Sequence, residues 1–198
     1  MPTRGTPRIT TRTGGEARSL LFLCAVLCLV LSLAAAHGRK QSMPPSEETS
    51  REARLEKGLR QTFPLYDYVG LEVQSASDGV YRCFVPFRPE NLNHISTIHA
   101  AIQWAASEVV GGLVMMSALA GVPFFAVVKN VSIDFKRPAR SGITTEAEFD
   151  DAAAQRLRAD FEREGEAGFS LHVTVCDDKG VEVASADAEY LARRPRGE

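Results

Sequence analysis

One acidic side chain is placed where it could do chemistry, because it falls inside an otherwise apolar helical stretch. Glu108 follows His99 by nine residues, and the segment between them is rich in alanine and carries no charge. An acid in such surroundings costs several kcal/mol to desolvate unless it is paired or put to use. A polar loop that contains Asn93 comes just before the helix. We therefore take Glu108 as the first candidate for a general base or a nucleophile.

The start of the same helix offers a second chemical group, its unpaired backbone amides. The first N–H groups of a helix have no partner within it and carry a partial positive charge. Ala100 and Ala101 lie there, and we expect their amides to stabilise the oxyanion that forms when a carbonyl is attacked. Asn93 could orient that carbonyl or a water molecule, and His99 could either cap the helix or act as a base. We expect the acid and these amides to share one groove.

The rest of the pattern predicts a sheet packed around this helix. The apolar stretch 98–120 predicts one long central helix, and shorter helices are expected at 51–62 and 151–164. Apolar residues that alternate along the chain predict six strands, at 69–77, 80–87, 125–135, 143–149, 169–175 and 181–191. An antiparallel sheet wrapped around the long helix, an α+β architecture, accounts for this order.

Small residues predict that the sheet approaches the long helix closely. Gly111 and Gly112 lie in the middle of the helix, where each costs roughly 1 kcal/mol relative to alanine. Close approach of another backbone is the usual reason to accept that cost. We expect Trp104, Met115 and Met116 to lie in the core, or else to line an acyl pocket.

Composition divides the chain into a leader, a linker and a domain. We place the leader at 1–41, a polar linker at 42–58 and the folded domain at 59–195. In the leader, arginines precede the uncharged apolar run 19–36, which fits either a cleaved signal peptide or a short membrane anchor. The excess of arginines before this run predicts that the domain lies across a membrane, outside the cell or in an organelle.

Charge and cysteine content exclude other classes of function. The net charge is −2, and such a chain has no basic field for nucleic acid. Cys83 and Cys176 are the two cysteines of the predicted domain, and neither has a cysteine or histidine nearby at metal-binding spacing. We therefore expect buried free thiols rather than a disulfide, no metal and no cofactor.

Two short motifs carry a resemblance to a known family. The first places an asparagine, a serine, a histidine, two small residues and an acid around the helix start: Asn93, Ser96, His99, Ala100, Ala101 and Glu108. The second is Arg-Pro-Ala-Arg-Ser-Gly at 137–142, after a strand. Together, over residues 64–193, they resemble the hotdog-fold acyl-CoA thioesterases of the phenylacetate-pathway type. Ser96 and the two alanines stand where that family has glycines.

The resemblance implies a hotdog fold, hydrolysis of an acyl thioester of CoA or of an acyl carrier, and a homodimer or homotetramer. In hotdog dimers the acid and the helix start serve one site across the interface. We expect the carboxylate of Glu108 to be catalytic, as general base or nucleophile. We expect the substrate to contact five further side chains: Ser96, Thr97, Trp104, Arg137 and Arg140. The two arginines suit the phosphates of CoA, although they could equally be surface charges.

Two other readings stay open. The chain could be a non-catalytic hotdog module that binds acyl groups or CoA, which the loss of the family's glycines favours. It could also be a hotdog dehydratase or hydratase, in which a histidine and an acid pair across the dimer and His99 is essential.

Overall fold

The computed structural model describes residues 50–195; the predicted leader and the first part of the linker lie outside this range. The described elements follow in chain order: α2 (Arg51–Thr62), α3 (Pro64–Tyr68), β1 (Glu72–Ser77), β2 (Val80–Val85), the 3-10 turn η1 (Pro89–Asn91), α4 (Ala100–Ala118), β3 (Phe125–Phe135), β4 (Ile143–Glu148), α5 (Asp151–Glu164), β5 (Glu166–Asp177) and β6 (Glu182–Arg193).

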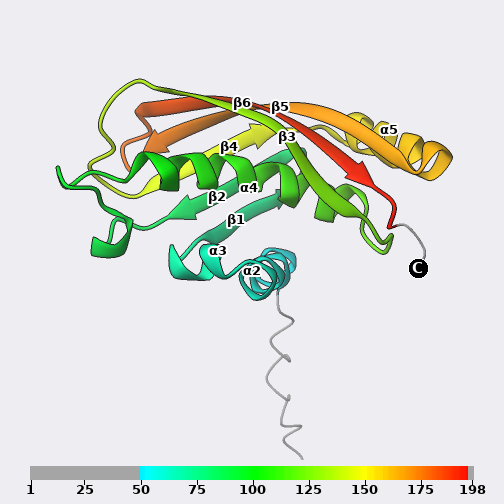
Figure 1. Ribbon diagram of the computed structural model, residues 1–198, viewed down its shortest axis with the longest axis horizontal. Coiled ribbons are helices and arrows are strands. Elements are labelled where there is room, and N and C mark those ends of the chain that lie inside the picture. The colour runs from blue at the N-terminus through cyan, green and yellow to red at the C-terminus, as the bar shows by residue number, and fades with distance from the viewer. Residues whose placement is uncertain (1–49, 196–198) are drawn as a thin grey trace, which may run out of the picture. The chain divides into compact units, whose positions relative to one another are not determined.

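The strands form one six-stranded antiparallel sheet in the order β1-β2-β4-β5-β6-β3. β3 pairs with β6 along its whole length, from Phe125 opposite Arg193 to Phe135 opposite Ala184, so its other side is an edge of the sheet. In Figure 1 the strands curve over α4, which runs along one face of the sheet. The protein therefore has the α+β hotdog architecture that we expected, an antiparallel sheet around one long helix.

The central helix owes its position to small and apolar residues. Val110, Leu113 and Val114 of α4 are fully buried under the sheet. A Cβ atom at Gly111 would lie 2.2 Å from Cζ of Tyr190 on β6, so this glycine makes room for a side chain of the sheet rather than for its backbone. A Cβ atom at Gly112 would meet no atom within 4 Å, so the predicted close approach of another backbone is wrong for both glycines. The length and composition of α4 would also suit a membrane span, but here it is the core helix of the sheet.

Several boundaries differ from the prediction. α3 was not expected; it begins with a proline, which fits the first turn of a helix because its missing N–H would have no partner there. α4 begins at Ala100 rather than at 98. α2 belongs to the folded unit from its first residue, because Ser50 caps it and the N–H of Val73 on β1 donates to Glu56, 2.9 Å away. Residues 51–58, which we placed in the linker, thus lie in the folded domain.

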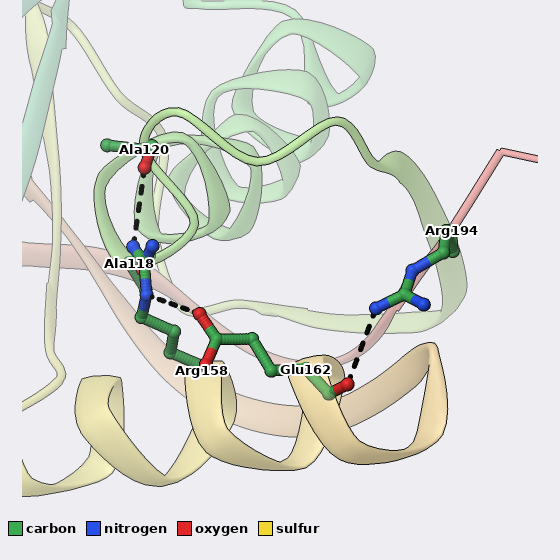
Figure 2. Close-up of polar contacts among 5 residues, drawn as sticks. All are labelled: Ala118, Ala120, Arg158, Glu162 and Arg194. Atoms are coloured by element: carbon green, nitrogen blue, oxygen red, sulfur yellow. Dashed lines mark hydrogen bonds and ion pairs between the residues drawn. The ribbon is translucent and has the colours of Figure 1, made fainter.

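The helix predicted at 151–164, α5, is hydrogen-bonded to the C-terminal end of α4. Its apolar pair, Leu157 and Phe161, is buried. Arg158 pairs with Glu162 one turn later, and its guanidinium donates to the carbonyl oxygens of Ala118 and Ala120, at 3.4 and 3.3 Å (Figure 2). Carbonyl groups at the end of a helix lack hydrogen-bond partners within it. Arg158 therefore satisfies carbonyl oxygens at and just after the C-terminal end of α4.

Candidate functional site

A largely apolar cavity of about 470 Å³ lies between α2, α3, α4 and the start of β3. We call it the Glu108 cavity, and the following residues line it: Gly58, Leu59, Thr62, Phe63, Tyr66, Glu108, Val109, Gly112, Met115, Met116, Phe124, Phe125, Ala126 and Val128. Glu108 is the one carboxylate among these lining residues. Met115 and Met116 line this cavity and also pack on the core.

Glu108 is held by two tyrosines. The hydroxyl of Tyr66 donates to Oε2 at 2.5 Å, and the hydroxyl of Tyr190 donates to the main-chain oxygen at 2.9 Å. Within residues 50–195, the second carboxylate oxygen, Oε1, makes no hydrogen bond. Burial raises the pKa of Glu108, and the hydrogen bond from Tyr66 acts in the opposite direction. A carboxylate with a raised pKa and a free oxygen can act chemically as a base or as a nucleophile.

Sequence reasoning missed Tyr66. It lies on the unpredicted α3, forty-two residues before Glu108, and nothing in the local pattern links the two. Burial raises the pKa of the Tyr66 phenol, and the nearby charge of Glu108 raises it further. Tyr66 is therefore a hydrogen-bond donor at any ordinary pH.

The start of α4 matches the prediction in part. His99 is the cap of the helix, and its Nδ1 accepts a hydrogen bond from the N–H of Ala101 at 3.0 Å. That N–H is therefore already engaged. Within the described residues the N–H of Ala100 makes no hydrogen bond, so it is the better candidate for an oxyanion donor.

The loop before α4 is organised by Asn93. Its Oδ1 accepts from the N–H groups of Ile95 and Thr97, at 3.0 and 3.1 Å, and its Nδ2 donates to Oγ1 of Thr97 at 2.8 Å. One N–H of the side-chain amide is left for a ligand. Ser96 has a φ of 56°, a left-handed conformation that glycine adopts without strain. Ser96 is therefore strained at the place where the motif that this segment resembles has glycine.

A second, open hollow of about 380 Å³ lies beside the helix start. We call it the Asn93 hollow, and these residues line it: Asn93, Ile95, Thr97, Ile98, Ala100, Gln103, Phe135, Lys136, Arg137 and Pro138. It gathers an amide side chain, a helix-start N–H and two cationic side chains. The structure therefore brings together four of the predicted site residues: Asn93, Thr97, Ala100 and Arg137.

The remaining predicted residues lie elsewhere. Ser96 and Arg140 are exposed and line neither the Glu108 cavity nor the Asn93 hollow. Trp104 is 40% exposed and directs its ring N–H toward the main-chain oxygen of Val131 on β3, 3.4 Å away. Our expectation that Trp104 belongs to the core is wrong, because α4 turns this position away from the sheet interior.

Within one chain the acid and the helix start do not meet. The Glu108 cavity and the Asn93 hollow share no lining residue. Ala100 and Glu108 are eight residues apart on one helix, which corresponds to about 12 Å along its axis. The expectation of a single groove is therefore wrong for a single chain.

The side chains that most often bind metal ions are not clustered in the described part of the chain. Within residues 50–195, no three His, Cys, Asp or Glu side chains lie close enough to hold a metal ion. Cys83 and Cys176 are both free thiols, as we expected; Cys83 is buried, whereas Cys176 is only half-buried. Burial raises the pKa of Cys83 to about 12, so it is not a nucleophile.

Comparison with known proteins identifies the family. A family model described as "Domain of unknown function (DUF4442)" matches residues 51–191, well over half of the chain. This chain belongs to that family. No curated protein matches it.

Solved structures share its fold. A Pseudomonas aeruginosa protein, PA5026, described as a protein of unknown function and "Probable Thioesterase", is 27% identical, with 71% of this chain and 94% of that chain covered and a TM-score of 0.63. A protein of unknown function from Chlorobaculum tepidum is 16% identical, with 73% and 94% covered and a TM-score of 0.64. The thioesterase HI1161 from Haemophilus influenzae is 10% identical, with 74% and 93% covered and a TM-score of 0.56. The DUF4442 domain of this chain thus has a thioesterase-like hotdog fold.

Proposed function

We propose that this protein hydrolyses an acyl thioester, carried by CoA or by an acyl carrier, with Glu108 as the catalytic carboxylate. The observation that carries the proposal is the Glu108 cavity: one half-buried acid, with an oxygen open to reaction, faces an apolar space large enough for an acyl group. The thioesterase-like fold and the motifs around Asn93 and Glu108 support the same reaction. That the acyl group is of the kind that phenylacetate-pathway enzymes hydrolyse remains a prediction from the sequence resemblance.

The reaction needs one base and one oxyanion donor. Oε1 of Glu108 takes a proton from a water molecule while the water oxygen bonds to the thioester carbonyl carbon. The carbonyl electron pair moves onto oxygen, where the N–H of Ala100 from a second copy of the chain stabilises the charge. The carbonyl re-forms, the C–S bond breaks, and the departing sulfur takes up the proton from Glu108. A carboxylic acid and a free thiol result.

The same residues permit a covalent variant. Glu108 could attack the carbonyl carbon directly, which would expel the thiol and leave a mixed anhydride that water hydrolyses. Both variants use the unbonded carboxylate oxygen of Glu108, and both need an oxyanion donor that a second copy of the chain would supply.

We propose that a second copy of the chain completes the site. The outer edge of β3 is unpaired within the described residues, and its side chains include Phe125 and Phe135, at 61% and 45% exposed. Trp104 lies beside this strand on the exposed side of α4. Two β3 edges that pair about a two-fold axis would cover these side chains. The Asn93 hollow of one copy would then face the Glu108 cavity of the other.

The direct test is release of free thiol from a panel of acyl-CoA and acyl-carrier thioesters, with wild type and Glu108→Gln. The proposal predicts turnover by wild type and a loss of at least about a hundredfold in kcat for the variant, the usual scale for a general base. Turnover that survives Glu108→Gln contradicts the role of Glu108. Binding of acyl-CoA without turnover by wild type would favour the acyl-binding module, and hydration of an enoyl thioester would favour the hydratase.

The location of the domain is a separate proposal. Residues 1–41 lie outside the described range, and we propose from their sequence that the run 19–36 targets or anchors the domain at a membrane. N-terminal sequencing of the mature protein tests this, since a start just after residue 36 indicates cleavage.

A further inference from the structure

We propose that Tyr66 is a positioning residue, which anchors Oε2 of Glu108 so that Oε1 is the oxygen presented to the thioester. This inference rests on the proposed hydrolysis and adds a residue to it. Nothing in the thioesterase motifs assigns a role to the α3 segment.

The contact itself is short and well placed. Tyr66 Oη lies 2.5 Å from Oε2, a separation typical of a hydrogen bond from a hydroxyl to a charged carboxylate. Tyr66 as a whole residue is only 8% exposed, so water competes little for the contact. A carboxylate on a glutamate side chain otherwise rotates freely about its last bond. Fixing one oxygen fixes the direction of the other.

The backbone that carries Tyr66 is itself held. The N–H of Leu71 donates to the main-chain oxygen of Tyr66 at 3.0 Å. Arg60 donates from Nε and Nη2 to the oxygen of Leu71, at 2.9 and 2.7 Å. The fully buried Asn91 donates to the oxygen of Val69 at 2.9 Å. Side chains from α2 and η1 therefore clamp the turn after α3, and Tyr66 reaches the acid from a rigid support.

The surroundings leave Tyr66 as the group that tunes Glu108. Among the residues that line the Glu108 cavity, none is a lysine, arginine or histidine. From β6, Tyr190 bonds the main chain of Glu108 and not its carboxylate. α2 and β3 contribute only uncharged side chains to the cavity. Removing the Tyr66 hydroxyl would thus leave burial unopposed, and Glu108 would hold its proton to higher pH.

Tyr190 provides a matched control. Both tyrosines are buried, both donate a hydroxyl hydrogen to Glu108, and a Tyr→Phe change keeps the ring in each case. Only Tyr66 touches the carboxylate. Tyr66→Phe and Tyr190→Phe therefore separate an effect on the reacting group from a general loss of packing or hydrogen bonding.

The experiment measures two quantities in wild type and both variants. The first is the acid limb of kcat against pH with a thioester that wild type hydrolyses. The second is the titration of the Glu108 carboxyl by ¹³C NMR, with its signal assigned by its absence in Glu108→Gln. We expect Tyr66→Phe to lower the kcat plateau about tenfold or more with little change in KM. We also expect it to move both the acid limb and the NMR titration to higher pH, while Tyr190→Phe leaves both in place.

The outcomes distinguish the two claims. Hydrolysis by wild type with an unshifted limb and titration in Tyr66→Phe overturns the role of Tyr66 and leaves the proposed function standing. Equal shifts in both variants also overturn it, because they indicate a general effect on the helix. No hydrolysis by wild type overturns the proposed function, and with it any reactive role for Oε1; the NMR titration still reports whether Tyr66 holds the carboxylate.

Discussion

The ring of Tyr190 occupies the space that a side chain at position 111 would need. A Cβ at Gly111 would lie 2.2 Å from that ring, whereas a Cβ at Gly112, the next residue, would meet no atom within 4 Å. The two glycines of α4 therefore have different structural roles. Gly111 lets β6 approach the helix, and Gly112 faces the Glu108 cavity.

The first prediction compares alanine at these two positions. Alanine favours a helix over glycine by roughly 1 kcal/mol, so Gly112→Ala should raise the free energy of unfolding by about that amount. Gly111→Ala should lower it by about 1–3 kcal/mol, because the buried ring of Tyr190 must move. Urea denaturation of both variants measures this. Equal effects at the two positions would contradict the packing described here.

The second prediction concerns the strained serine. Ser96 adopts a left-handed φ, which costs a side-chain-bearing residue roughly 1–2 kcal/mol. Ser96→Gly should therefore stabilise the protein by about 0.5–1 kcal/mol after the greater entropy of the unfolded glycine is counted. His94, exposed and without a positive φ, serves as control, and His94→Gly should destabilise the protein in the same denaturation experiment.

The third prediction is a pH dependence of stability. Burial raises the pKa of Glu108 in the folded state, so the folded protein holds this proton more tightly than the unfolded chain does. The resulting stability is fully present below the ordinary pKa of a glutamate and is lost as pH rises through the folded pKa. Glu108→Gln should thus have a higher Tm than wild type at neutral pH, with a difference that vanishes below about pH 4. A variant less stable than wild type at pH 7 would indicate a structural acid.

The fourth prediction concerns assembly. Trp104→Glu would place a charge in the proposed interface and should convert a dimer into monomers with loss of hydrolysis. Phe87 is equally exposed, at 41% against 40% for Trp104, and lies in the loop after β2. Phe87→Glu should leave the mass measured by light scattering unchanged. Monomeric and fully active Trp104→Glu would contradict a shared site.

The fold was predictable because its signals are local and periodic. The alternation of apolar and polar residues along the strands reflects burial of one face, and the apolar run of α4 reflects burial on nearly all sides. Both patterns can be read directly from a single sequence. Glu108 was found for a related reason, because a charged residue within an apolar run is also a local signal in the sequence. α3 escaped prediction because five residues carry too little periodicity, and Tyr66 escaped with it.

The arrangement of the site was less predictable, because it depends on which way helix faces point. The spacing from Asn93 to Glu108 indicated one site, yet the helix start at Ala100 and the acid at Glu108 lie about 12 Å apart along one helix. Likewise, His99 accepts a hydrogen bond from the N–H of Ala101. The sequence alone does not say whether this histidine caps the helix or leaves that N–H free for a ligand.

The most direct test of the shared site mixes two inactive variants. Ala100→Pro removes the proposed oxyanion N–H at the first residue of α4, where proline is well tolerated and His99 is already extended. Glu108→Gln removes the base. After the two are unfolded and refolded together in equal amounts, half of the dimers should contain one intact site, with the acid from one chain and the amide from the other. A site shared between two chains should restore about a quarter of wild-type hydrolysis, as expected for random two-fold pairing. Hydrolysis no greater than that of either variant alone would contradict it.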